Sequence, residues 1–134
     1  MMVMDEDGCT CDFEQKKKIL IFACSGASNV GQLANAAAIE LARQGEGTFY
    51  CIAGIGAHIS GMLETARIAD EIIAIDGCPA SCVKCTLEHA GLPVHRHVVV
   101  TNLGIEKNHN FTLDEGALER LVWLVDYEII VPMK

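Results

Sequence analysis

The chain has 134 residues, of which 51% are hydrophobic but only 5% aromatic, and it carries a formal net charge of −8. This length suits a single domain with a substantial core, and the acidic balance argues against nucleic acid as a partner, because phosphate binding needs clustered Lys and Arg. No stretch approaches the roughly 18 uninterrupted apolar residues of a membrane span, and residues 1–15 lack the pattern of a signal peptide, so we expect a cytoplasmic protein without a membrane partner.

The first 15 residues are polar, acidic and without hydrophobic periodicity. Such a composition is typical of a flexible tail. We therefore expect an acidic tail over residues 1–15 and a single α/β domain over residues 16–134. Cys9 and Cys11 lie in this tail, and the sequence does not indicate a role for them.

Four short apolar runs predict β-strands. The first, residues 18–23, is apolar almost throughout, which is typical of a parallel strand covered on both faces. The last run begins with His95 and Arg96, and this polar start indicates an edge position. The predicted strands are residues 18–23, 48–53, 71–75 and 95–100.

Segments with helical spacing of apolar residues alternate with these strands. Gly45 and Gly91 end two of them, as glycine commonly does at helix C-termini. The predicted helices are residues 30–44, 60–69, 79–91 and 113–127. This alternation predicts an α/β fold: a three-layer, Rossmann-like sandwich around a four-stranded parallel sheet with strand order 2-1-3-4.

The turn after the third predicted strand carries three cysteines, Cys78, Cys82 and Cys85. Pro79 suits the first position of a helix, which makes Cys78 the expected N-cap. A helix N-terminus favours negative charge, so a thiolate at Cys78 would be stabilised there. The apolar side chains of that helix would face the core, and Cys82, Cys85 and His89 would lie on another side.

The predicted strand order gathers thiols from distant parts of the sequence. Sites in such sheets form beyond the carboxyl ends of the strands, where the strand order reverses. Strands one and three would be neighbours about 4.8 Å apart, so Cys24 and Cys78 would leave the same edge side by side, with Cys82 one helical turn further on. Cys51 or Cys85 would supply a fourth sulfur. A set of thiolates at the carboxyl edge of the sheet suits zinc or an iron–sulfur centre.

Two other readings of these cysteines remain open. We expect a small metal-binding protein that holds zinc. The first alternative is a cysteine-based redox or persulfide-handling enzyme, with Cys78 as the attacking thiolate and Cys82 or Cys24 resolving it, and the second is a small iron–sulfur protein. The sequence does not decide whether the protein is an enzyme, and it assigns no catalytic residue. The metal ion is the expected ligand, with a further protein as a partner for metal or sulfur transfer; the oligomeric state is not indicated.

Nucleotide and phosphate sites are disfavoured. Gln32 stands where a nucleotide P-loop needs lysine, and Ile59 stands where a dinucleotide fingerprint needs its third glycine. Val30 stands where a cysteine phosphatase loop after Cys24 needs arginine. The spacing of Cys78, Cys82 and Cys85 matches radical-SAM enzymes, but those need a much larger partial barrel.

With these residues described, the chain resembles the DGC-domain family, named for the tripeptide found here as Asp76-Gly77-Cys78. The resemblance covers roughly residues 18–125. It rests on residues 23–26, 30–35, 51–54, 73–79 with Cys82, and 97–104.

The family is regarded as zinc-binding because of its cysteine pattern, and the resemblance implies Cys24, Cys51, Cys78 and Cys82 as ligands. This chain departs from close members at two cysteine positions, and residues 106–109 stand where they carry a lysine-rich segment. The resemblance implies no reaction.

Overall fold

The computed structural model describes residues 17–130 of the chain. The predicted acidic tail, residues 1–15, lies outside this range, and so do Cys9 and Cys11. The described part contains one four-stranded parallel sheet in the order β2-β1-β3-β4, which confirms the predicted topology. The strands are β1 (Ile19–Ala23), β2 (Thr48–Phe49), β3 (Glu71–Asp76) and β4 (Arg96–Val99).

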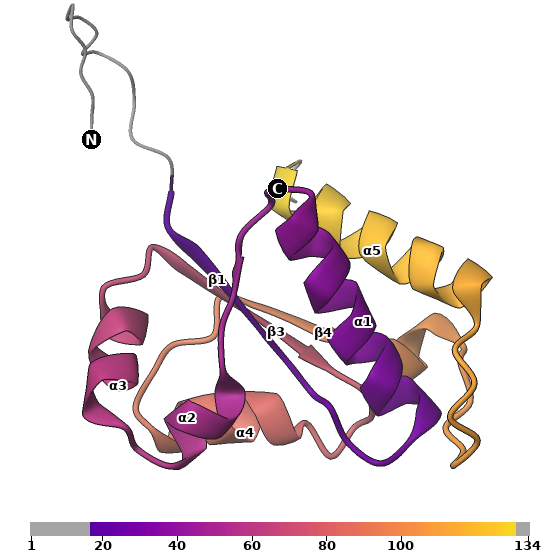
Figure 1. Ribbon diagram of the computed structural model, residues 1–134, viewed down its shortest axis with the longest axis horizontal. Helices are drawn as coiled ribbons and strands as arrows, with labels where there is room; N and C mark the ends of the chain where they lie inside the picture. The colour runs from indigo at the N-terminus through magenta and orange to yellow at the C-terminus, as the bar shows by residue number, and fades with distance from the viewer. Residues whose placement is uncertain (1–16, 131–134) are drawn as a thin grey trace, which may run out of the picture.

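Helices cover both faces of this sheet. Figure 1 shows α1 and α5 side by side on one face and α2, α3 and α4 on the other, so the predicted three-layer sandwich is confirmed. The helices are α1 (Asn29–Arg43), α2 (Ile52–Gly56), α3 (Ser60–Arg67), α4 (Cys82–His89), the 3₁₀-helix η2 (Val100–Leu103) and α5 (Glu115–Ile130).

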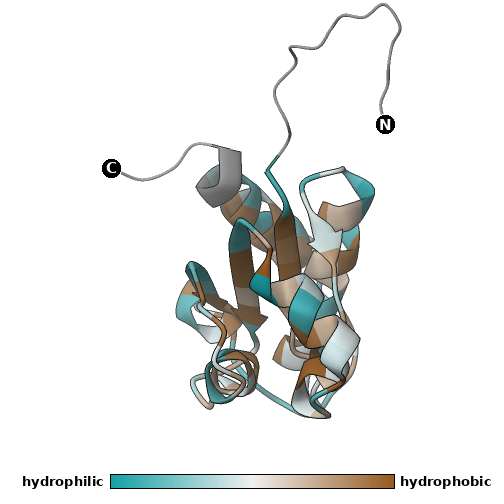
Figure 2. Ribbon diagram, turned by 90° about the vertical axis from the view of Figure 1, so that its left-hand side faces the viewer, coloured by the Kyte–Doolittle hydropathy of each residue, from teal (hydrophilic) through white to brown (hydrophobic). Residues whose placement is uncertain are grey.

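Two apolar cores sandwich the central strands. Successive residues of a strand point to opposite faces, so in β1 Ile21 packs towards α1 and α5, whereas Leu20 and Phe22 pack towards α2, α3 and α4. All residues of β3 are buried. Figure 2 shows the strands as an apolar centre with polar residues on the outer sides of the helices. Burial on both faces is the reason that these strands are continuous apolar runs in the sequence.

Strand β2 is shorter than predicted. The sequence indicated a strand over residues 48–53, but the chain leaves the sheet after Tyr50, whose N–H donates to Ile21 at 2.9 Å. Cys51 then caps α2, because its sulfur accepts a hydrogen bond from the N–H of Gly54 at 3.3 Å. Residues 52–56, which include two glycines, are therefore helical.

The predicted edge position of the fourth strand is confirmed, since β4 pairs only with β3 in the described sheet. Helix α5 begins two residues later than predicted. The Oδ1 atom of Asp114 accepts a hydrogen bond from the N–H of Ala117 at 3.2 Å, so Asp114 caps this helix. Within residues 17–130, no helix has the length and apolar character that crossing a membrane requires.

Candidate functional site at the carboxyl edge of the sheet

Asp76, the last residue of β3, organises the turn that carries the cysteines. It is only 1% exposed. Its carboxylate accepts hydrogen bonds from the N–H groups of Val83 at 2.8 Å and Lys84 at 3.1 Å. The Nε2 atom of His97 on β4 lies 2.9 Å from the same carboxylate. Because Asp76 satisfies two unpaired donors of the first turn of α4, it acts as the cap of that helix from six residues upstream.

The predicted N-cap was wrong. Helix α4 begins at Cys82, with Ser81 as the residue before it, and Cys78 and Pro79 belong to the preceding turn. Ser81 has a left-handed backbone with φ of 53° and makes no side-chain cap bond. Because α4 begins at Cys82, the positive end of the helix dipole lies nearer to Cys82 than to Cys78 in the chain.

Backbone segments pack closely around this turn. A Cβ atom on Gly77 would lie 2.8 Å from the backbone N of Gly31, and one on Gly31 would lie 2.8 Å from the backbone of Gly26. Glycine is therefore required at these positions by close approach. The turn after β1, the first turn of α1 and the turn after β3 form one compact unit.

Cys24 and Cys78 leave the same edge of the sheet from neighbouring strands. Ala23 pairs with Ile75, and the N–H of Cys24 donates to the carbonyl of Ile75 at 2.9 Å. Both cysteines are partly buried and pack against the core beneath α1 and α5. This placement is the one that the predicted strand order implied.

Three of the sulfur atoms each accept a hydrogen bond. Cys24 accepts from the N–H of Gly26 at 3.2 Å, and Cys51 accepts from the N–H of Gly54 at 3.3 Å. Cys78 accepts from the ammonium group of Lys107 at 3.5 Å. The thiolate is the form of a cysteine that binds metal or attacks an electrophile.

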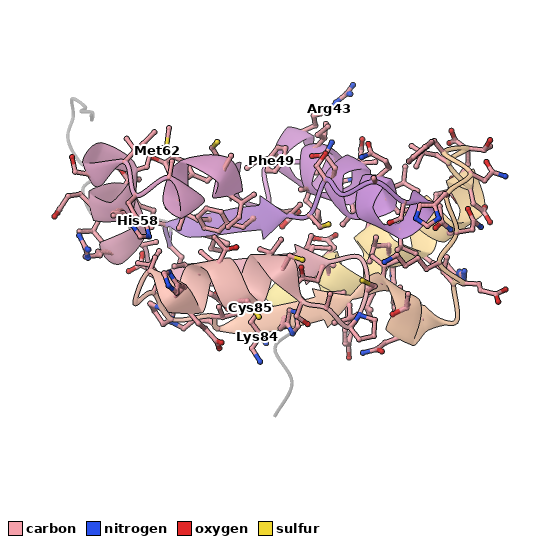
Figure 3. The ribbon with its side chains drawn as sticks, turned by 90° about the horizontal axis from the view of Figure 1, so that it is seen from below. Arg43, Phe49, His58, Met62, Lys84 and Cys85 are labelled. Carbon is pink, nitrogen blue, oxygen red and sulfur yellow. The ribbon has the colours of Figure 1, made fainter. Side chains whose placement is uncertain are left out.

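Cys82 and Cys85 are exposed on α4, on the side away from the buried Val83 and Leu87, as the helical spacing predicted. Figure 3 shows Cys85 beside Lys84 on α4, and His58 on the segment between α2 and α3. Cys85 lines a surface cavity with His58 and His89, whose rings stack with centroids 5.9 Å apart. The sulfur-bearing residues Cys24, Cys51, Cys78 and Cys82 are not among the residues that line this cavity.

The donor types at this edge fit a soft metal ion, but their spacing does not gather them around one point. Within residues 17–130, no group of three His, Cys, Asp or Glu side chains is arranged to hold a metal ion. The edge therefore consists of separately supported thiols rather than a closed coordination site.

Asn29 holds the loop that carries Lys107. It is 8% exposed. Its Nδ2 donates to the carbonyl of Glu106 at 2.8 Å, and its Oδ1 accepts from the N–H of Asn108 at 2.6 Å. Its own N–H donates to the carbonyl of Asn108 at 3.0 Å. These bonds bracket Lys107 on both sides and so fix the backbone from which its ammonium group reaches Cys78.

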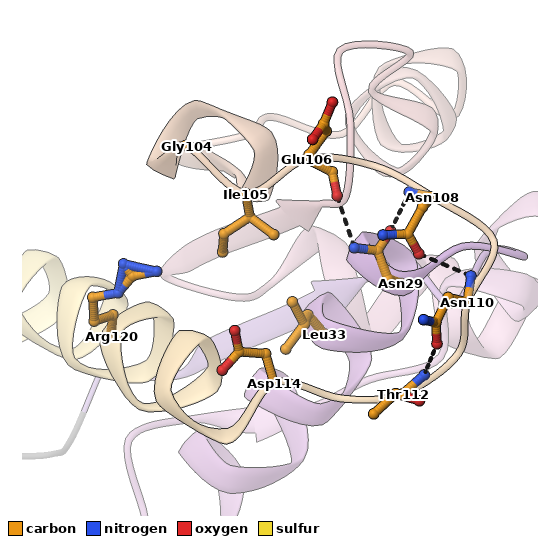
Figure 4. Close-up of a pocket in the computed structure, with 10 residues that line it drawn as sticks. All are labelled: Asn29, Leu33, Gly104, Ile105, Glu106, Asn108, Asn110, Thr112, Asp114 and Arg120. Atoms are coloured by element: carbon orange, nitrogen blue, oxygen red, sulfur yellow. Dashed lines mark hydrogen bonds between the residues drawn. The ribbon is translucent and has the colours of Figure 1, made fainter.

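The same loop encloses a polar cavity of about 370 Å³ beside the start of α1. Figure 4 shows Asn29 and Leu33 from α1 facing the loop, with Arg120 of α5 at the far end. Sequence reasoning missed the roles of Asn29, Lys107 and His97. Asn29 stands at a helix start, where asparagine is common, and the contact of Lys107 with Cys78 spans 29 positions, so neither leaves a local pattern in the sequence.

Comparisons with known proteins show the family of this chain. The DGC domain family model matches residues 20–125. The anaerobic and virulence modulator AnvM of Pseudomonas aeruginosa is 39% identical to this chain over 103 residues, which cover 76% of this chain and 78% of that protein. No solved structure matches the chain. The matched region covers most of the chain and includes the carboxyl ends of β1 and β3 and the Asp76-Gly77-Cys78 turn, so the chain belongs to the DGC-domain family.

Proposed function

We propose that this protein binds zinc reversibly through cysteine thiolates at the carboxyl edge of the sheet. Cys24, Cys78 and Cys82 are the ligands, and Cys51 or Cys85 supplies the fourth sulfur. The observation that carries the proposal is that thiols following β1, β2 and β3 each accept an N–H hydrogen bond at the same edge. Hydrogen bonds to sulfur offset the negative charge that accumulates when several thiolates share one cation.

Reversible binding fits the fold better than a structural role for the ion. Structural zinc supplies folding energy to domains that lack a sufficient core. Here buried apolar side chains fill the space on both faces of the sheet, and Cys24 and Cys78 are only partly buried against that core. A zinc ion at this edge would therefore be a bound signal or cargo.

No three of the candidate ligands in residues 17–130 are arranged around one point, so zinc binding requires the cysteine side chains to move closer to one another. Cys51 and Cys82 are exposed, so rotating their side chains towards Cys24 and Cys78 disturbs little packing. A site that closes only when metal is present would respond to metal availability. Such a response suits a modulator, which is how the relative AnvM is named.

The contact between Lys107 and Cys78 favours a second candidate, thiol exchange. In that reaction the Cys78 thiolate attacks a disulfide of another molecule, forms a mixed disulfide and releases one thiolate. Cys82 then attacks the sulfur of Cys78, which leaves a Cys78–Cys82 disulfide and releases the second thiolate. The two electrons taken from the protein thiols reduce the incoming disulfide.

Elemental analysis of protein purified without air separates these functions. We expect zinc in the wild type that survives mild reductant, leaves with a chelator and is lost from Cys78→Ser. Variants Cys51→Ser and Cys85→Ser identify the fourth ligand, because only the ligating position lowers the zinc content. Unchanged zinc in Cys78→Ser defeats the zinc proposal, metal-free protein that cycles between dithiol and disulfide supports thiol exchange, and absorption near ~400 nm indicates an iron–sulfur centre.

A further inference from the structure

A groove between α1 and α5, on the face covered by these two helices, combines carboxylates with exposed aromatic rings. It has a volume of about 420 Å³ and is separate from the cysteine edge, since Glu40 lies about 16 Å along α1 from Asn29. We call it the acidic groove. It is lined by Glu40, Gln44, Glu115, Leu118, Glu119, Val122, Trp123 and Asp126.

One face of α5 sets the chemistry of this groove. Residues four apart in a helix lie one above the other, so Glu115, Glu119, Trp123 and Tyr127 form a single stripe. Trp123 is 64% exposed and Tyr127 is 40% exposed. Their rings stack with centroids 5.4 Å apart and an interplanar angle of 18°. Large aromatic rings left exposed on a helix that otherwise packs into the core mark an interaction surface.

The charge of the groove selects the partner. Among the described residues, four carboxylates line it, from Glu40, Glu115, Glu119 and Asp126, and no basic side chain does. Arg120 on α5 lines the cavity beside Asn29 instead. Arg43, near the end of α1, extends away from the body of the molecule in Figure 3.

We infer that the acidic groove docks an arginine-bearing helix of a partner protein. A guanidinium group can lie flat on the ring of Trp123 while it donates to the carboxylate of Glu119 one turn away. An apolar side chain can make neither the cation–π contact nor the hydrogen bond. The apolar floor of Leu118 and Val122 accommodates the aliphatic face of an amphipathic helix. The groove repels phosphate, which excludes anionic lipid and nucleic acid as its occupant.

Binding is tested with the full-length protein and a synthetic amphipathic helical peptide that carries arginines on one face. The control peptide has citrulline in place of arginine, which keeps the shape and removes the charge. Trp123 is the single tryptophan of the chain, so its fluorescence reports occupancy directly. We expect the arginine peptide to shift and quench this emission, with affinity that falls as salt rises, and the citrulline peptide to bind at least tenfold more weakly.

Charge reversal locates the site. Glu119→Lys should weaken binding of the arginine peptide at least tenfold by calorimetry, and Trp123→Leu should weaken it about fivefold. Glu64→Lys, an exposed change of the same charge on α3 on the other face of the sheet, should leave binding unchanged. Circular dichroism establishes that each variant is folded.

Three results would overturn the inference. Equal loss in Glu64→Lys and Glu119→Lys would mean that only net charge attracts the peptide. Equal binding of the citrulline peptide would mean that arginine is not recognised. A dimer of the wild type that dissociates in Glu119→Lys would identify a second copy of this chain as the occupant. Loss of zinc in Cys78→Ser has no bearing on any of these outcomes, so this inference and the zinc proposal fail separately.

Discussion

The ammonium nitrogen of Lys107 lies 3.5 Å from the sulfur of Cys78, although the two residues are 29 positions apart in the chain. The contact places a positive charge beside the sulfur of Cys78. The contact depends on Asn29, which fixes the loop on both sides of Lys107. Residues from three separate segments therefore set the reactivity of one sulfur atom.

Replacement of the lysine should lower the reactivity of Cys78. In Lys107→Ala we expect alkylation of Cys78 by iodoacetamide at neutral pH to slow roughly threefold, a modest effect because Lys107 is exposed and solvent screens its charge. Tandem mass spectrometry separates modification of Cys78 from that of Cys82. Lys84→Ala on α4 is the matched control and should leave the rate unchanged. Equal slowing in both variants would show that only the overall charge matters.

Asn29→Ala should reproduce the loss of Cys78 reactivity without removing the lysine. The substitution removes two side-chain hydrogen bonds of a buried residue, which typically costs about 1–3 kcal/mol of unfolding free energy. Urea denaturation measures that cost, and alkylation of Cys78 measures the positioning effect. Asn35→Ala, on the same helix, should affect neither quantity. A destabilised Asn29→Ala that keeps the wild-type alkylation rate would show that Asn29 is structural only.

Asp76→Ala should destabilise the fold by about 2–4 kcal/mol, because it leaves the N–H groups of Val83 and Lys84 unpaired beside a buried site. Helix α4 should fray at its first turn, which amide hydrogen exchange at these two positions would detect. Asp70→Ala is the control, since its carboxylate is exposed and accepts one backbone bond from Lys18. Similar losses in the two variants would contradict the capping role of Asp76.

Glu71, at the opposite end of β3, makes the fold sensitive to acid. Its burial raises the pKa of the carboxyl, but the hydrogen bond from Arg96 and the charge of Lys17 outweigh this effect and hold the pKa below its ordinary value. A lowered pKa means that the ionised form stabilises the fold above the unfolded pKa of about 4.3 and that this contribution disappears as pH falls through the folded pKa.

Glu71→Gln should therefore be less stable than the wild type at pH ~7 by roughly 1–3 kcal/mol, and the two proteins should converge as pH falls through the lowered folded pKa of Glu71. Urea midpoints across this range measure the difference. Glu64→Gln, whose ion pair with Arg67 is exposed, should show no such pH dependence. A constant gap between Glu71→Gln and wild type at all pH values would contradict the electrostatic origin.

The sequence predicted the architecture because both central strands are covered on two faces and therefore appear as apolar runs of strand length, as in residues 18–23 and 71–75. The strand order then placed Cys24 and Cys78 at one edge. Capping was not predictable in the same way. The cap of α4 comes from Asp76, six residues before the helix, whereas sequence rules look for a cap directly beside the first turn.

The loop around Lys107 lay beyond sequence reasoning for a different reason. Residues 104–110 have no periodicity, and their position depends on Asn29, which looks like an ordinary residue at a helix start. The shortness of β2 depends on a local contact that apolar periodicity does not reveal, the bond between the sulfur of Cys51 and the N–H of Gly54 three residues later. Apolar patterns determine the layers of this protein, and single polar contacts determine the geometry of the edge.

The central claim is that the thiols following β1 and β3 act on one metal ion, and a double-mutant cycle on zinc affinity tests it most directly. Competition with a fluorescent chelator would be measured for wild type, Cys24→Ser, Cys78→Ser and the double variant. If both sulfurs bind the same ion, each single variant should lose nearly as much affinity as the double variant. Losses that add independently, or no loss in Cys24→Ser, would contradict a shared site.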